Sequence, residues 1–419
     1  MSVSAIMTSK GTKSLIEKFQ KSLGARMSGE GEAETLELLY GLSGELQREM
    51  TACKGPAGEI GNLIAEMGSI RFADELRGYS ERFERLLAEQ FACRSSVREI
   101  HELSCSFHEK FVATALNHAI QLLQQEGRTP PDISSALLVS GELGRREAIL
   151  GERSSFFFVF QDCGAEERGY FEELALRSMA VLSVRFPAIN RSMFKGGNLF
   201  WSGPRGEWEE YVLALLKGGD AANRVFGGES DELLFSRMFE TVADLRFLCG
   251  DTVFAEGLVE RSRKFLGDGV SGERFWHLAK RIAVMPLALS IFGRLKTERS
   301  GRHKGAFSLK SLAIDPLVDA SRILAVAEGG AGTSTVERLK AVLAAGNLGV
   351  ALADRLLVAY QDFLRQLVRL ELEAGSDADS LYLNPDILDE ASRERLRDGL
   401  EDISTLQRFV YQQLVEVEQ

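Results

Sequence analysis

The amino-acid sequence predicts a mostly helical α+β protein with N-terminal helices, a small middle region carrying a short mixed sheet, and a C-terminal helical bundle. Apolar residues recur every three or four positions from about Thr12 to Gln125, and helical patterns return from Glu207 onward. Only two short runs, SSALLVSGE and SSFFFVFQD, have the composition of buried strands. A chain of 419 residues is too long for one ordinary core, so we expect three regions, residues 1–94, 95–262 and 263–419.

The middle region begins with a long helix that continues to about Gln125, where Gly127 and the Pro130-Pro131 pair end it. The two apolar runs follow as strands, separated by a turn rich in Gly and Arg that we expect to hold one short helix. An amphipathic helix then ends before Pro187, and a less regular part rich in Gly and aromatic residues occupies 191–208.

The C-terminal region contains clear helix signals. Asp315 is placed to cap a helix in which Pro316 occupies the first turn, and Gly329 lies just past its end. Ser334 and Glu337 have the spacing of a capping box at the start of the next helix. A last helix is expected over residues 390–417.

Composition excludes several classes of protein. The net charge of -11 argues against a general nucleic-acid surface. The longest apolar run, residues 282–292, is too short to span a membrane and contains Pro286, and the N-terminal residues have no apolar core of a secretory signal. The five cysteines are dispersed, odd in number and without a CxxC pair, which favours reduced thiols in the cytoplasm.

The middle of the chain resembles the bacterial nucleotidyltransferases related to protein-PII uridylyltransferase, which often accompany CBS or cyclic-nucleotide-binding modules. The resemblance rests on a Pro-Pro step, a strand and a Gly-x-x-Gly-Arg-x-Glu turn, and it extends over roughly residues 95–415 into the C-terminal substrate-binding domain of that family. The residues that carry it are Pro130-Pro131, Gly141, Gly144, Arg145, Glu147, Asp244, Arg246, Gly250, Asp251, Leu309-Lys310, Pro316 to Asp319, Arg322 and Thr335 to Leu339.

This resemblance implies a nucleotidyltransferase-like α/β core whose chemistry uses two metal ions held by an Asp-x-Asp pair on the second strand. Aligned on the turn, the two aspartate positions fall on Arg153 and Ser155, and the phosphate-binding serine falls on Glu142. No Asp or Glu occurs from Leu174 to Gly206, where a further metal ligand would be expected. We therefore predict no catalytic residue and no metal ligand at this degenerate site.

The same residues are compatible with a metal-free anion pocket, since guanidinium groups and a phosphate-shaped turn suit a nucleoside triphosphate without bound metal or an acidic protein surface. The alternative is that these arginines are solvated or pair with nearby glutamates. The predicted nucleotide- or anion-binding residues are Gly141, Gly144, Arg145, Arg146, Glu147, Arg153 and Ser155.

Other side chains at suggestive spacings have structural interpretations. His101, Cys105 and His108 share one helical face, but one straight helix rarely supplies three metal ligands, so a core-facing stripe is expected. Asp244 is expected to join the middle region to the C-terminal helices through ion pairs, together with Arg246 and Asp251. The same structural role is expected of Lys310, Asp319 and Arg322.

Three functional hypotheses follow. The first is a cytoplasmic signalling protein, descended from uridylyltransferase-type enzymes and unable to transfer nucleotides, which binds a nucleotide or a regulatory protein through the former active-site cleft. The second is an active enzyme that transfers a uridylyl or adenylyl group to a small regulatory protein and depends on Glu147 or Asp162. The third is a helical adaptor that forms a homodimer through its N-terminal helices. Neither nucleic acid nor membrane is expected as a partner.

Overall fold

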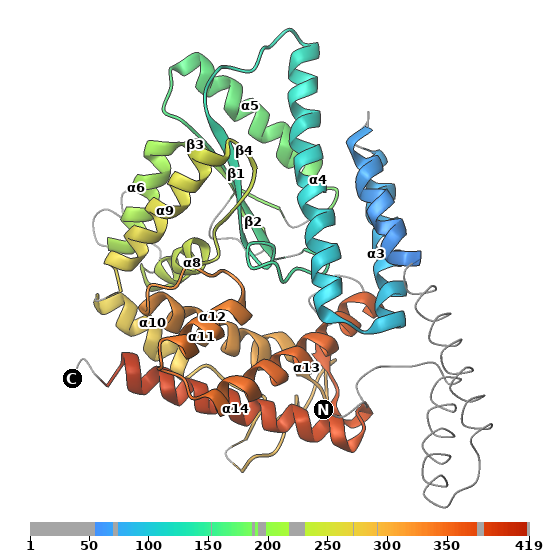
Figure 1. Ribbon diagram of the computed structural model, residues 1–419, viewed down its shortest axis with the longest axis vertical. Coiled ribbons are helices and arrows are strands. Elements are labelled where there is room, and N and C mark those ends of the chain that lie inside the picture. The colour runs from blue at the N-terminus through green and yellow to red at the C-terminus, as the bar shows by residue number, and fades with distance from the viewer. Residues whose placement is uncertain are drawn as a thin grey trace, which may run out of the picture.

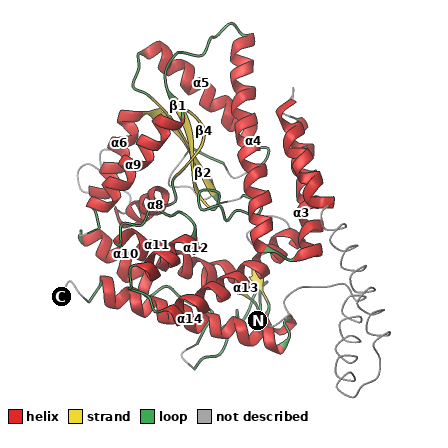
Figure 2. Ribbon diagram, viewed as in Figure 1, coloured by secondary structure: helices red, strands yellow, loops and turns green. Residues whose placement is uncertain are grey.

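A four-stranded mixed sheet lies at the centre of the upper half of the molecule (Figures 1 and 2). Its strands are β1 (Ser135–Gly141), β2 (Ser154–Phe160), β3 (Phe200–Pro204) and β4 (Arg246–Gly250), in the order β3-β2-β1-β4. β1 is antiparallel to both β2 and β4, whereas β2 and β3 are parallel. The computed structural model describes residues 55–69, 74–151, 153–186, 189–191, 198–217, 231–270, 272–290, 292–374 and 381–416.

Helices cover both faces of the sheet, as the contacts of the β2 side chains show. Successive strand residues point to opposite faces. Phe158 packs on Phe171 of α5 (Ala165–Leu182), with ring centroids 6.0 Å apart, and Phe157 packs on Trp208 of α6 (Arg205–Lys217) at 5.1 Å. The unbroken aromatic run of β2 is therefore explained by burial on both sides.

The remaining helices of the upper half extend these two layers. On the α5 side lie α3 (Glu75–Arg94) and the long α4 (Val97–Gln125). On the α6 side lie α8 (Asp231–Ala243) and α9 (Thr252–Asp268), which contact β1 and β4. A further helix covers residues 55–66, followed by η2 (Met67–Ser69).

The lower half of the molecule is a helical bundle next to the end of the sheet at which β1 ends and β2 begins (Figure 1). A two-stranded ribbon, β5 (Phe307–Ser308) with β6 (Tyr382–Leu383), accompanies the bundle, and η5 (Pro385–Ile387) follows β6. The helices are α10 (Glu273–Ala283), η3 (Lys310–Ile314), α11 (Asp315–Ala327), α12 (Thr335–Ala344), α13 (Val350–Ala374) and α14 (Glu390–Leu414).

The predicted fold class, α+β and mostly α, is confirmed. The long helix that ends at Gln125, the strands at the two apolar runs and the capping box of Ser334 and Glu337 are present as expected. The helices expected between residues 12 and 54 lie outside the described residues. The boundaries 1–94, 95–262 and 263–419 stay a prediction. None of the helices in the described ranges has the length and apolarity needed to cross a membrane.

Three local predictions were wrong. The segment between β1 and β2 contains successive turns, not a short helix. Asp315 does not cap α11, because the π-helical turn η3 leads directly into that helix and Asp315 is its first residue. The part expected to be irregular includes β3, which is a strand because β2 supplies its pairing partner.

Candidate functional site

The turn after β1 is held in place by its two glycines. Gly141 has a φ of +78°, a left-handed conformation that glycine adopts without strain, and a Cβ atom there would collide with the carbonyl oxygen of Arg153. At Gly144 a Cβ atom would collide with the carbonyl oxygen of Asp244 and would lie 2.8 Å from the Cα of Ser140. The Gly-x-x-Gly spacing is thus required for the turn to pack against β2 and the segment after α8.

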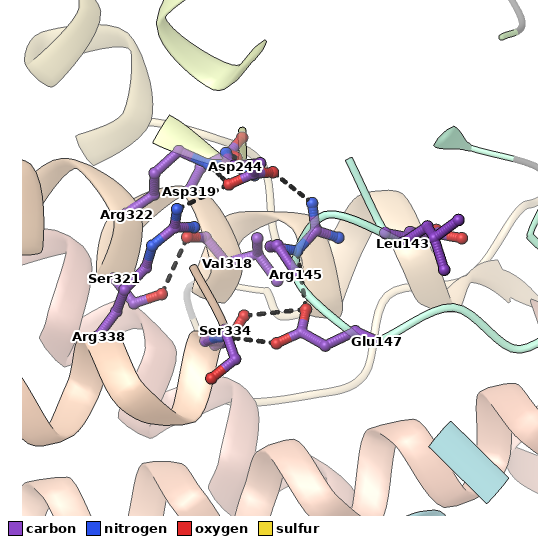
Figure 3. Close-up of polar contacts among 12 residues, drawn as sticks. Leu143, Arg145, Glu147, Asp244, Val318, Asp319, Ser321, Arg322, Ser334 and Arg338 are labelled. Carbon is purple, nitrogen blue, oxygen red and sulfur yellow. Dashed lines mark hydrogen bonds and ion pairs between the residues drawn. The ribbon is translucent and has the colours of Figure 1, made fainter. Parts of the chain in front are cut away.

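Asp244, just after α8, is the centre of a buried ion network (Figure 3). Its Oδ2 accepts hydrogen bonds from Arg145 Nη1 at 2.7 Å and Arg322 Nη2 at 2.9 Å. Its Oδ1 accepts one from Arg322 Nε at 3.0 Å and lies 2.7 Å from Arg338 Nη2. One carboxylate therefore binds three guanidinium groups, one from the turn, one from α11 and one from α12.

These charges determine the protonation of Asp244. Burial alone would raise the pKa of its carboxyl group, but the positive charges of Arg322, Arg338 and Arg145 hold that pKa well below its usual range. Arg322 also pairs with Asp319 on α11. The expected roles of Asp244 and Arg322 as structural links between the middle region and the C-terminal helices are confirmed. The same expectation was wrong for Arg246, which pairs with Glu109 of α4, and for Asp251, which caps α9.

Glu147 forms a second link from the turn to the C-terminal bundle (Figure 3). Its buried carboxylate accepts a hydrogen bond from Arg145 Nε at 2.7 Å. It also accepts from the backbone N–H of Thr335 at 2.6 Å and from the hydroxyl of Thr335 at 3.2 Å. Glu147 therefore places a negative charge at the N-terminus of α12, where the helix dipole favours it.

Glu142, at the position of the phosphate-binding serine, is also buried and paired. Its carboxylate forms an ion pair with the Nζ of Lys310, whose side chain is only 6% exposed. The carboxylate of Glu142 therefore places a negative charge at the turn, next to Lys310 of the C-terminal bundle.

Arg153 immediately precedes β2 and Ser155 is its second residue; the resemblance predicts the two aspartate positions here. The Arg153 side chain is 45% exposed and its Nη1 is 3.9 Å from Asp315 Oδ2, so the pair is a weak one. The hydroxyl of Ser155 accepts a hydrogen bond from the backbone N–H of Leu199 at 3.3 Å. A guanidinium and an engaged hydroxyl do not fit a pair of divalent cations, and no group of three or more His, Cys, Asp or Glu suited to a metal occurs among the described residues.

Arg146 differs from the other predicted residues of the turn. It is exposed and has a φ of 60°, which is rare for a residue with a side chain. It lines a cavity of about 910 Å³ together with residues of α4 and α13, and neither Arg153 nor Ser155 lines that cavity. The predicted anion-binding residues therefore lie at two separate places, the cavity and the start of β2. That these residues bind an anion stays a prediction.

The remaining sequence candidates have structural surroundings. Cys105 and His108 are buried on α4 and His101 is partly buried, as expected for a core-facing or partly buried stripe, and burial raises the pKa of the Cys105 thiol to about 12. Asp162 accepts a hydrogen bond from the backbone N–H of Gly206 at 3.0 Å, at the start of α6. Asp251 caps α9 through the N–H of Phe254.

Two participants in the network escaped the sequence analysis. Arg338 and Tyr360 are buried in the C-terminal bundle and interact with Asp244 and Glu147, respectively. The signal for Arg338 was its place within the Thr335 to Leu339 match. For Tyr360 the sequence offered none, since an aromatic residue within an amphipathic helix is expected in the core.

Comparisons with known proteins agree with this architecture. Residues 81–221 match the family model described as "Putative nucleotidyltransferase DUF294". Residues 273–414 match the model described as "Putative nucleotidyltransferase substrate binding domain". No curated protein matches the chain. The chain therefore carries the two domains that these models describe, a nucleotidyltransferase domain of the DUF294 family followed by its substrate-binding domain.

Proposed function

We propose that this chain is a cytoplasmic regulatory protein of the nucleotidyltransferase type, related to protein-PII uridylyltransferase, which does not transfer nucleotides. It acts by binding a nucleotide or a protein partner at the surface around Arg153, where an active relative would hold its metal ions. The observation that carries the proposal is the guanidinium of Arg153 at the first metal-ligand position.

Electrostatics support this reading. Two unit charges separated by about 4 Å interact by roughly 4 kcal/mol at an effective dielectric near 20, and a divalent ion doubles that value. Aspartate at position 153 would attract such an ion, whereas arginine repels it by a similar amount before solvent screening. The substitution therefore replaces a cation site with a site that favours anions.

The buried pair of Glu142 and Lys310 supports loss of catalysis independently. In this arrangement the Glu142 carboxylate neutralises Lys310 and would repel a triphosphate at the turn. Arg145 is likewise engaged by Glu147 and Asp244. The positive charge left for a partner on this side of the turn is that of Arg153, which favours one acidic group of a nucleotide or of a protein surface.

A transfer assay separates this proposal from an active enzyme. The full chain is incubated with each of the four radiolabelled nucleoside triphosphates, with magnesium or manganese, in the presence of a small regulatory protein of the PII type. We expect no label on either protein. A variant of Glu147 is a poor test here, because its buried carboxylate joins the turn to α12, whereas Asp162 is exposed and can be replaced.

A metal-binding measurement tests the electrostatic claim directly. The double variant Arg153→Asp with Ser155→Asp restores a carboxylate at both positions, near Asp315, and should bind Mn²⁺ at least about tenfold more tightly than the natural chain. The control is Arg77→Asp, which makes the same arginine-to-aspartate change at an exposed position of α3 and should leave Mn²⁺ binding unchanged. Equal Mn²⁺ affinity of the natural chain and the double variant would contradict the proposal.

Binding itself is measured by calorimetry with ATP, UTP and GTP, with and without magnesium. The proposal expects any affinity to be independent of magnesium and weakened in Arg153→Ala. Tight binding that requires magnesium would favour the active enzyme. The adaptor hypothesis is tested separately by light scattering on the full chain and on a chain that starts near Ser95, because two monomers would remove its main support.

A further inference from the structure

The cavity of about 910 Å³ that Arg146 lines is separate from the surface around Arg153. Its walls come from α4, the turn after β1, the start of β4, α9, the loop before α12, and α13. β3 and β4 form the two opposite edges of the sheet, and the cavity lies beside β4. Its volume is within the range of sites that hold small organic ligands.

The charges around this cavity do not balance. Three of its arginines are neutralised by lining glutamates, in the pairs Arg145–Glu147 at 2.7 Å, Arg246–Glu109 at 2.8 Å and Arg98–Glu102 at 2.7 Å. Arg146 has no ion-pair partner in the part of the chain that the structure describes. Arg263 has none there either, and its Nη2 donates a hydrogen bond to the carbonyl oxygen of Leu245 at 3.3 Å. The remaining lining acid, Glu337, is engaged in the capping box of α12.

Two further polar atoms at the cavity are buried without a partner among the described residues. They are Nε2 of His101 and Nε of Arg246. Burial lowers the pKa of His101 to about 4, so its ring is neutral at pH 7. Unsatisfied buried polar atoms are uncommon in folded proteins, so these two mark a polar wall of the cavity that the described residues do not fully satisfy.

The backbone at Arg146 is consistent with a binding role. Its positive φ costs free energy that a glycine would not, and such strain concentrates at functional sites. Apolar residues also line the cavity, among them Val97, Val336 and Leu364, so it suits a ligand with an organic part.

We propose that this cavity binds a small organic phosphate, with Arg146 and Arg263 supplying the positive charge. The cavity is lined by five arginines and four glutamates, so its lining carries one net positive charge, and guanidinium groups bind phosphate oxygens in pairs. Because the walls belong to both halves of the molecule, the ligand stabilises their contact. This inference does not depend on the function proposed for the surface around Arg153.

The test is a thermal-shift and calorimetric titration of the full chain at low salt with adenosine monophosphate, a hexose phosphate and inorganic phosphate. We expect at least one of the two organic phosphates to bind more tightly than inorganic phosphate and to raise the melting temperature. The two organic arms distinguish a nucleotide from a sugar phosphate as the source of the phosphate group.

Arg146→Gly is the decisive variant, because glycine removes the guanidinium and suits the positive φ, so the variant should fold at least as stably as the natural chain. Its affinity for the organic phosphate should fall at least about tenfold. Arg77→Gly, which removes an exposed guanidinium of α3 away from both the cavity and the surface around Arg153, is the matched control and should bind this ligand as the natural chain does. Undiminished binding by Arg146→Gly, or no binding of either organic phosphate at millimolar concentration, would overturn the proposal.

Discussion

Replacing Asp244 by asparagine removes the negative charge that the three guanidinium groups share. The oxygen–nitrogen distances of 2.7 to 3.0 Å place each arginine in direct contact with the carboxylate. At about 2.8 Å and an effective dielectric near 20, each charge pair contributes roughly 6 kcal/mol of gross attraction, much of which offsets the cost of burying the ions. Arg145 would keep Glu147 and Arg322 would keep Asp319, but Arg338 would lose the carboxylate it binds. Leaving this buried guanidinium uncompensated and weakening the other two pairs should destabilise the fold by about 3–5 kcal/mol.

The measurement is urea denaturation followed by tryptophan fluorescence. Trp208 lies beneath the sheet and Trp276 lies in the C-terminal bundle, so single-tryptophan versions of the chain report the two halves separately. In the natural chain we expect the two probes to show one transition. In Asp244→Asn the transitions should move to lower urea and separate, since the network joins the turn, α11 and α12.

Asp398→Asn is the control, because the side chain of Asp398 is 59% exposed and its pairing with Arg397 contributes little. It should change the free energy of unfolding by less than about 0.5 kcal/mol. The reasoning is refuted if Asp244→Asn costs less than about 1 kcal/mol, because the network would then contribute no more than an exposed pair.

Two further predictions concern single positions. Burial raises the pKa of Glu240 to about 7, so its contribution to stability is fully present below the ordinary glutamate pKa and is lost as the pH rises toward 7. Across that pH window Glu240→Gln should therefore become more stable relative to the natural chain, by at most ~1.4 kcal/mol per pH unit. The control, Glu256→Gln at an exposed position, should show no such trend. Parallel stability–pH curves for the natural chain and Glu240→Gln would contradict the prediction. Gly144→Ala should lower the free energy of unfolding by roughly 1–3 kcal/mol, because the new Cβ would lie 2.8 Å from the Cα of Ser140. Gly169→Ala, in open space on α5, should instead add up to ~1 kcal/mol in the same urea denaturation experiment, and equal effects of the two changes would be inconsistent with the packing.

The sequence predicted the helices and strands that a local residue pattern identifies. β1 and β2 are dense in apolar residues, and α12 begins with a capping box, so neither depends on distant partners to be recognised. β3 and β4 are five residues each and contain Gly, Trp, Arg or Cys without alternation. They are strands because β2 and β1 offer hydrogen-bonding edges, a condition that the local sequence does not express.

The candidate site divides in the same way. The structural role of Asp244 and the pairing of Asp319 with Arg322 could be predicted from charge and spacing. The pairing of Glu142 with Lys310 could not, because these residues meet only after the bundle docks against the turn. Arg146 and Arg153 are close in sequence and looked equivalent, but the turn directs them to different places.

The buried contact between Glu142 and Lys310 also limits which amino-acid substitutions this chain can accept. Substituting Glu142 alone would strand an ammonium ion in the interior, and substituting Lys310 alone would strand a carboxylate. Removing this charge pair from the turn without loss of stability therefore requires both partners to be altered together. Single replacements pass through a less stable intermediate, so folding alone maintains the present pair.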